Sequence, residues 1–384
     1  MKPRQPMNTP LTRRNLLVLT GACLSGCGGG DASLASGPPG TGGTGVFAQG
    51  SISGFGSVIV NGIKFDDTQA VIALDGVTAS SVALRLGMVA DIKGRRDASL
   101  MLGTASSIEI WSTAQGAVSQ LASNAFTVAR MTIRTDSNTV FDGLASVAAM
   151  TPGLRVTVWG LQAGADGQEW IVATRVALAS GSAVVSTGVI SSMDSGTFVN
   201  GLRLTGSSMG QWMAGDMVRV QGVLSDSGDS IAVTSSRVMG PGLSFQPDGE
   251  VEIEGLVTAI SSPGRFMLGR FDVDASAVAF SQVSAQIVSG MRLKVTGTWQ
   301  TGVLQATRIE VEGELALQSV EIKGAIEKFV GLSNFVVRGQ RCDASSASMA
   351  VGTAAQLQNG KLVEINGIKA GDVLRVVDLK LISG

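Results

Sequence analysis

The 384-residue sequence contains no histidine and no tyrosine, and it has only three cysteines. The missing histidine excludes a Ser-His-Asp triad, a histidine general base and a histidine metal ligand. The cysteines are too few for the thiolate sites that hold structural zinc or iron–sulfur clusters. These absences favour a protein that is not an enzyme and that carries no cofactor.

Charged and aromatic side chains are also scarce. Charged residues make up 15% of the chain, aromatic residues 4%, and the formal net charge is −1. A chain this close to neutrality offers no electrostatic basis for binding nucleic acid, so no nucleic-acid partner is expected. Glycine, by contrast, is abundant: there are 51 glycines, a share close to twice the usual value of about 7%.

Residues 1–26 have the organisation of an export signal. Basic residues without any acidic residue precede the apolar run 16–19, and the tetrapeptide Leu24-Ser25-Gly26-Cys27 follows. This tetrapeptide resembles the bacterial lipobox, which implies cleavage before Cys27 and lipidation of its thiol. The pair Arg13 and Arg14 resembles the twin-arginine export motif. Two arginines also serve simply as the positive charge that an export signal needs, so both readings of the pair stay open.

The rest of the N-terminal region predicts a tethered envelope protein. Removing the four basic residues of 1–26 from the 29 in the chain leaves 25 basic against 30 acidic residues, a net charge of −5. Residues 27–48 are rich in Gly, Ser, Thr and Pro and predict a flexible tether. Glycine rather than aspartate follows Cys27, which favours the outer membrane in lipoproteins of this kind. We therefore expect a protein anchored to the membrane by lipid, at the outer membrane, facing the periplasm or the cell surface.

The remaining chain consists of one unit repeated five times. Each unit opens with the pattern Gly-x-[Ile/Val]-[Ser/Thr/Glu], and the opening glycines follow one another at intervals of 66, 72, 67 and 69 residues. These opening glycines are Gly50, Gly116, Gly188, Gly255 and Gly324. Turn sequences such as Asn61-Gly62 and Asn200-Gly201 then predict a hairpin. The repeat divides the chain into five β modules, which span 49–112, 113–182, 183–246, 247–316 and 317–384.

A pair of glycines seven positions apart recurs in every unit. The pairs are Gly87 and Gly94, Gly153 and Gly160, Gly215 and Gly222, Gly290 and Gly297, and Gly360 and Gly367. Apolar and polar residues alternate between them, which predicts a strand with one buried and one solvated face. Each unit holds about five or six short strands, and a sheet of this size buries enough apolar surface only if it closes. The predicted fold class is therefore all-β, a tandem array of five small antiparallel, OB-like β-barrel modules.

These features together resemble a known family. The lipobox, the tether, the segment GSISGFGSVIVNG (50–62) and the recurring glycine-paired strand are similar to a bacterial lipoprotein family built from tandem small β-barrel domains of unknown function. The resemblance covers nearly the whole chain after the signal. It implies the architecture of repeated barrels and brings no catalytic residue with it.

The fourth module contains two rows of carboxylates. One row lies on a single predicted strand and the other at the end of the same module; they are Glu250, Glu252 and Glu254, and Glu310, Glu312 and Glu314. If the two strands pair, the clustered carboxylates would suit calcium, and paired carboxylates would also suit glycoside hydrolysis. The alternative is a solvated strand face, balanced by Arg265, Arg270 and Arg308.

The other candidate side chains predict structural roles. Arg341 precedes Cys342 and would lower the pKa of its thiol, but a nucleophilic cysteine needs a base, so we expect a small, partly buried residue. The five tryptophans are Trp111, Trp159, Trp170, Trp212 and Trp299. Trp159 and Trp299 fall near the equivalent strand end in two units, but Trp111 and Trp212 do not, so we expect packing in the core or at its rim and not a stacking platform.

The five units repeat, and no single unit has a distinctive group of polar residues. This pattern favours multivalent binding over catalysis. The sequence therefore predicts a non-enzymatic, envelope-anchored binding or scaffold protein that contacts a protein or polysaccharide partner through its module surfaces. The first alternative is a ligand- or calcium-binding envelope protein that uses the acidic strand of the fourth module. The second is a glycan-directed hydrolase.

Overall fold

A computed structural model describes residues 44–97, 101–164, 169–193, 195–207, 210–239, 249–278, 287–312 and 319–382. All of them belong to one compact unit of the chain, Gly42–Gly384. The predicted signal, Cys27, Arg13 and Arg14 lie outside the described residues. Within the described ranges, no helix is long and apolar enough to cross a membrane.

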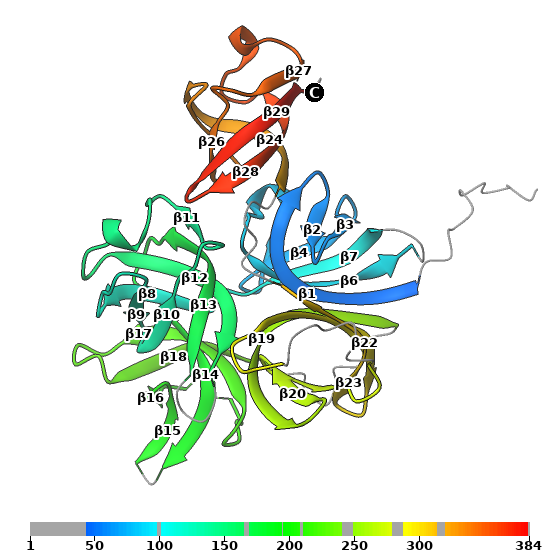
Figure 1. The fold of residues 1–384 in the computed structure, drawn as a ribbon. Coiled ribbons are helices and arrows are strands. Elements are labelled where there is room, and N and C mark those ends of the chain that lie inside the picture. Colours follow the sequence, from blue (N-terminus) through cyan, green and yellow to red (C-terminus); the bar gives the residue numbers. More distant parts are fainter. Residues whose placement is uncertain are drawn as a thin grey trace, which may run out of the picture. The chain divides into compact units, whose positions relative to one another are not determined.

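The strands follow one another in five groups, each of which forms one barrel (Figure 1). Barrel 1 comprises β1 (Thr44–Phe55), β2 (Val58–Val60), β3 (Ile63–Asp66), β4 (Val71–Leu74), β5 (Val77–Ala79), β6 (Val89–Arg96) and β7 (Leu102–Ile110). Barrel 2 comprises β8 (Ala114–Ser119), β9 (Ala125–Val128), β10 (Met131–Arg134), β11 (Val140–Asp142), β12 (Arg155–Ala163) and β13 (Trp170–Leu178). Barrel 3 comprises β14 (Val184–Met193), β15 (Gly196–Val199), β16 (Leu202–Thr205), β17 (Met217–Leu224) and β18 (Ser230–Val238).

The last two barrels have the same order of strands. Barrel 4 comprises β19 (Glu250–Ser262), β20 (Arg265–Leu268), β21 (Phe271–Asp274), β22 (Arg292–Gln300) and β23 (Val303–Val311). Barrel 5 comprises β24 (Ser319–Gly331), β25 (Asn334–Val337), β26 (Gln340–Asp343), β27 (Ser348–Val351), β28 (Leu362–Ala370) and β29 (Val373–Leu381). Strand β1 begins inside the range predicted as tether, because it pairs with β6 from Thr44 onward and buries Phe47 and Ala48.

Each group closes into a ring of hydrogen-bonded strands, as barrel 4 illustrates. Strands β19, β20 and β21 pair antiparallel in succession, β22 pairs antiparallel with both β19 and β23, and β21 pairs in parallel with β23. The equivalent parallel pairings are β3–β7, β10–β13, β16–β18 and β26–β29. The prediction of small OB-like barrels is thus confirmed with one difference. The third strand and the last strand of each barrel, which close the ring, run parallel to each other. They do so because the chain crosses one end of the barrel after the third strand.

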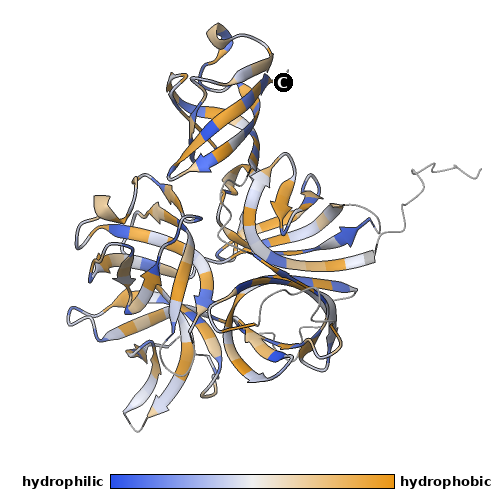
Figure 2. Cartoon of the chain, viewed as in Figure 1, coloured by the Kyte–Doolittle hydropathy of each residue, from blue (hydrophilic) through white to orange (hydrophobic). Residues whose placement is uncertain are grey.

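Apolar side chains fill the barrels, and hydropathy alternates along most of their strands (Figure 2). In barrel 4, for example, Phe266, Phe271 and Val295 are buried in one apolar cluster. A separate cluster combines residues of barrels 1 and 5, such as Phe65 and Phe335, with Trp159 of barrel 2. The barrels therefore do not have five independent cores.

The paired glycines of the repeat occupy two distinct backbone situations. The first glycine of each pair has a positive φ, between +77° and +97°, a conformation that other residues rarely adopt. At the second glycine the register between the last two long strands shifts in all five barrels, which is the mark of a β-bulge. A Cβ at Gly297 would lie 2.0 Å from the backbone oxygen of Gln305. The glycine pattern therefore encodes a turn and a bulge.

Barrels that are distant in sequence are joined by a strand pairing. Residues 46–49 of β1 pair in parallel with residues 250–253 of β19. The same part of β1 pairs with β6 along its other edge, and β19 likewise pairs with β22. Barrels 1 and 4 thus share one continuous stretch of sheet, which the tandem order of the sequence did not predict.

Candidate functional site

The acidic residues predicted to cluster lie in barrel 4 on strands that are not neighbours. Strand β22 lies between β19, which carries the first row of glutamates, and β23, which carries Glu310. Lys294 of β22 stands opposite Glu254 on one side and opposite Glu310 on the other. The two strands that carry the glutamates therefore do not pair with each other. The positively charged Lys294 lies between the two rows of carboxylates. Glu314 lies outside the described residues.

Glu254 is buried, with 8% exposure, against barrel 1. Its Oε2 accepts hydrogen bonds from the backbone N–H of Ser51 at 2.8 Å and from the Ser51 hydroxyl at 3.0 Å. Its Oε1 accepts a hydrogen bond from Nε of Arg292 at 2.7 Å. This carboxylate consequently joins β1 to barrel 4.

Arg96 of barrel 1 holds the other two glutamates of β19. Its Nη1 lies 2.6 Å from Glu250 and 3.5 Å from Glu252. Glu252 is only 4% exposed, and burial raises the pKa of its carboxyl, which Lys294 and Arg96 oppose. Barrel 1 therefore covers the part of this strand face that carries Glu252 and Glu254, whereas the Glu250 side chain keeps 38% exposure. We call Ser51, Arg96, Glu250, Glu252, Glu254, Arg292 and Lys294 the charged layer.

The balancing arginines predicted from sequence are mostly placed elsewhere. Arg308 does pair with Glu310, at 2.7 Å, and Lys294 pairs with the same carboxylate at 2.6 Å and with Glu312 at 3.9 Å. Arg265 instead approaches two aspartates on the neighbouring strand, at 3.8 and 3.9 Å. In the part of the chain that the structure describes, no group of three or more His, Cys, Asp or Glu could hold a metal ion.

Cys342 is buried in barrel 5, more completely than the partial burial that was predicted. Burial raises the pKa of its thiol to about 12, and the Sγ donates to the backbone oxygen of Gln340 at 3.4 Å. Arg341 does not lower this pKa, because its guanidinium pairs with Asp372 at 2.5 Å. A thiol in this state is unreactive.

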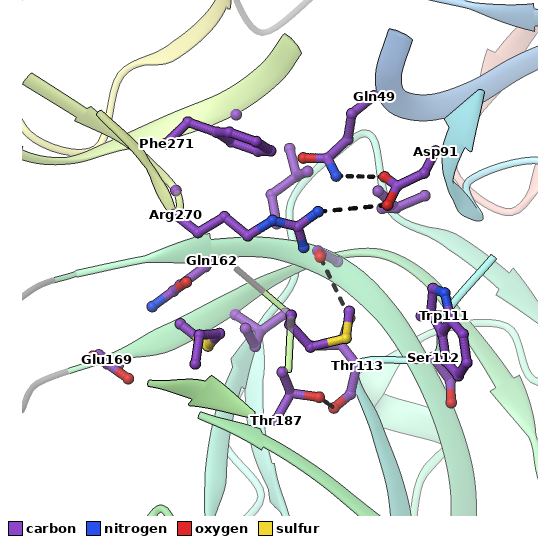
Figure 3. A pocket seen from close by; sticks show the side chains of 18 of the residues that line it. Gln49, Asp91, Trp111, Ser112, Thr113, Gln162, Glu169, Thr187, Arg270 and Phe271 are labelled. Carbon is purple, nitrogen blue, oxygen red and sulfur yellow. Dashed lines mark hydrogen bonds and ion pairs between the residues drawn. The ribbon is translucent and has the colours of Figure 1, made fainter. Parts of the chain in front are cut away.

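A pocket of about 110 Å³ is lined by residues of barrels 1 to 4 (Figure 3). Its apolar lining comprises Val89, Trp111, Met131, Leu161, Trp170, Ile171, Met217, Met239, Leu268 and Phe271. Its polar lining includes Gln49, Asp91, Glu109, Thr113, Gln162, Glu169, Thr187, Asn200 and Arg270. Apolar walls with a few polar groups are typical of sites for small molecules.

Arg270 enters this pocket from the turn between β20 and β21. Its Nη2 lies 3.5 Å from Oδ2 of Asp91, whose Oδ1 accepts a hydrogen bond from Gln49 (Figure 3). The Arg270 side chain keeps 22% exposure, yet its Nε is buried and finds no hydrogen-bond partner among the described residues. Burial lowers the pKa of this guanidinium, and Asp91 opposes the shift.

Two tryptophans line the pocket, a role that sequence reasoning missed. The guanidinium of Arg237 lies 4.4 Å from the ring centre of Trp111, and that of Arg134 lies 4.3 Å from the ring centre of Trp170. Trp159 is buried, as expected. Single aromatic residues from different units converge on one space, so a search for a recurring aromatic position could not find them.

The sequence did contain an indication that Arg270 contacts another barrel. It occupies the turn position that Gly62 and Gly201 fill in the first and third units. Arg130 occupies the same position in the second unit, and its Nη1 reaches the backbone oxygen of Gly201 in barrel 3 at 2.8 Å. An arginine at this turn therefore marks a contact with another barrel.

Comparisons with known proteins agree with the repeat. The model of a family described as "Domain of unknown function (DUF5666)" matches residues 115–177 and 254–310. Both matches begin at the residue before an opening glycine and end within the last strand of a barrel. Barrels 2 and 4 are thus similar to a domain of unknown function, which confirms this part of the family prediction.

The other comparisons add no functional information. No curated protein matches the chain. A solved structure described as "drosophila Unr CSD456" aligns with 44% of this chain and 78% of its own, at 16% identity and a TM-score of 0.14. A likeness at that TM-score carries no argument about fold or function.

Proposed function

We propose that the protein is a non-enzymatic, lipid-anchored scaffold of the cell envelope that binds a protein or a polysaccharide through the surfaces of its barrels. The observation that carries this proposal is the charged layer with the adjoining β1–β19 pairing. The ion pair between Arg96 and Glu252, the hydrogen bonds from Ser51 to Glu254 and the backbone pairing of β1 with β19 join two barrels that are distant in sequence. Similar surfaces held in a fixed array suit multivalent binding.

Photo-crosslinking in intact cells tests the binding role. A photoreactive residue replaces one exposed apolar residue in each of three barrels: Val71 in barrel 1, Met213 in barrel 3 and Val330 in barrel 5. The proposal expects the same partner to be captured from at least two of these positions. Capture of nothing but the protein itself at all three positions would overturn it. Val273, which is buried in barrel 4, serves as the control position.

The envelope location has its own test. Cys27→Ser is expected to release the protein from membranes into a soluble fraction, because the lipidated thiol is lost. Unchanged partition into membranes contradicts the lipid anchor. Replacing Arg13 and Arg14 together by lysine is expected to stop export if the twin-arginine route is used, and export that continues assigns the protein to the general route.

A further inference from the structure

We propose that the pocket lined by barrels 1 to 4 binds a small zwitterion with an apolar side chain, of the free α-amino acid class. The pocket is separate from the exposed barrel surfaces assigned to the scaffold function. The inference therefore stands whether or not those surfaces bind a partner.

Arg270 supplies the site for the carboxylate. Its guanidinium carries five N–H donors, and the contact with Asp91 at 3.5 Å is long for a charged hydrogen bond. Its Nε–H is buried without a partner among the described residues. The side chain keeps 22% exposure, and a ligand carboxylate pairs with its terminal N–H groups, since carboxylate and guanidinium match in planar geometry.

Glu169 supplies the site for the ammonium group. Four acidic side chains line the pocket, and three of them pair with an arginine: Asp91 with Arg270, Glu109 with Arg237 and Glu254 with Arg292. In the described ranges, Glu169 has neither an ion pair nor a hydrogen bond to its carboxylate, and it lies in partly desolvated surroundings. A half-buried carboxylate without a counter-charge loses part of its solvation, and an ammonium group compensates for that loss.

The apolar walls and the volume limit what lies between the two charged groups. Met131, Met217, Leu268 and Trp111 are among the lining residues, so an apolar side chain of the ligand finds apolar contacts there. The pocket volume is about 110 Å³, whereas a cavity of about 150 Å³ accommodates the six carbons of benzene. A ligand of about six non-hydrogen atoms fits, and alanine has that size, whereas a nucleotide or an oligosaccharide is too large.

Isothermal titration calorimetry with the full chain tests the proposal, with alanine as the probe. Propionate lacks the ammonium group of alanine, and alaninamide lacks its carboxylate. Loss of one charged hydrogen-bonded contact weakens binding about tenfold or more. We therefore expect alanine to bind, and each analogue to bind at least about tenfold more weakly.

Two variants assign the contacts to their residues. Arg270→Gln is expected to remove the preference for alanine over alaninamide, and Glu169→Gln the preference for alanine over propionate. The matched controls are Arg265→Gln and Glu364→Gln, which change charged residues that do not line the pocket and are expected to keep both preferences.

The titrations of the unmodified protein with alanine and its two analogues test the proposal even if a variant fails to fold. No heat of binding for alanine at millimolar concentration overturns the proposal, as does an analogue that binds as tightly as alanine. A failed crosslinking experiment leaves these titrations unaffected, so failure of the scaffold function and failure of this site are distinguishable.

Discussion

The carboxylate of Glu254 shows how one residue joins two barrels. It receives two hydrogen bonds from Ser51 in barrel 1 and pairs with Arg292 in its own barrel. Both members of this ion pair are largely removed from water. Breaking a buried pair leaves an uncompensated charge, which costs about 3–5 kcal/mol.

Glu254→Gln is therefore expected to lower the stability of the protein by about 3 kcal/mol, because the guanidinium of Arg292 loses its counter-charge. The midpoint of urea denaturation measures the effect. Glu364→Gln is the matched control: its carboxylate lies 3.8 Å from Lys380 near the surface, and such pairs contribute about 0–1 kcal/mol. Equal shifts for both variants would mean that the charged layer does not stabilise the protein.

Lys369 is a second residue whose burial has a measurable consequence. Its Nζ donates to the backbone oxygens of Asn138 at 2.7 Å and Thr139 at 2.8 Å, which links barrel 5 to barrel 2. Burial lowers its pKa from 10.5 to about 8, although Asp136 opposes the shift. Between these two pH values the unfolded chain binds more protons than the folded chain, so this residue makes stability rise with pH.

Lys369→Met removes that contribution. Between about pH 8 and pH 10.5, the urea midpoint of the unmodified protein is expected to rise relative to that of the variant, in the direction required by proton linkage. Lys361→Met, at an exposed position of the same barrel, serves as the control. A difference between Lys369→Met and the unmodified protein that stays constant over this range contradicts the shifted pKa.

Cys342 yields a prediction about reactivity. Because burial raises the pKa of its thiol to about 12, the nucleophilic thiolate is almost absent at neutral pH. Iodoacetamide is expected to leave Cys342 unmodified in the native protein and to modify it in denaturant. Mass spectrometry of the peptide that contains Cys342 measures this, and rapid modification of the native protein would show that the thiol is accessible.

Among the elements, the last two long strands of each barrel carry the repeated bulge. The sequence predicted these strands well, because period-two alternation and paired glycines are local signals of a strand and its turns. It did not predict the parallel closing pairs or the β1–β19 pairing. Alternation identifies which face of a strand is buried or polar, but it contains no information about the strand that lies along each edge.

The same reasoning explains why the burial of Glu252 could not be predicted. Glu252 alternates with Val251 and Ile253 as a residue of a solvated face does, yet barrel 1 covers it. Its partner Arg96 lies 156 residues away in the sequence, and no local pattern connects the two. Arg270 and Asp91 likewise come from different barrels. The pocket could therefore not be derived from any single unit of the repeat.

Gly297→Ala tests the bulge. A Cβ at this position would lie 2.0 Å from the oxygen of Gln305, whereas at Gly302 it would meet nothing within 4 Å. Gly302→Ala is expected to cost about 1 kcal/mol, because only its positive φ is unfavourable. Gly297→Ala is expected to cost more, about 2 kcal/mol or above, because the backbone itself must shift. Thermal denaturation compares them, and a smaller loss for Gly297→Ala would refute the role of the bulge.

At the scale of the whole molecule, barrel 1 is a centre of contacts. Arg219 of barrel 3 is buried and donates to the backbone oxygen of Ser112 at 2.8 Å and to its hydroxyl at 2.9 Å. The same guanidinium pairs with Asp75 of barrel 1 at 2.9 Å. In barrel 5, Glu321 pairs with Lys64 of barrel 1 at 2.6 Å. Several barrels are thus attached to the first one through polar side chains.

Arg219→Gln is expected to loosen barrel 3 selectively, because Asp75 and Ser112 lose their buried partner. Hydrogen exchange followed by mass spectrometry is expected to show faster exchange in β14–β18 and unchanged exchange in β24–β29. Lys64→Gln gives the converse control, since its ion pair involves barrel 5. Equal acceleration in every barrel after either change would mean that the barrels open only together.

The β1–β19 pairing also has a consequence for the nascent chain. About 200 residues separate the two strands, and a ribosome that adds about 5–20 residues per second needs roughly 10–40 s to synthesise them. Barrel 1 can close during this time, but the edge of β1 that later meets β19 has no partner. An open strand edge pairs readily with other chains. The first barrel to leave the ribosome is therefore the one that most needs a chaperone.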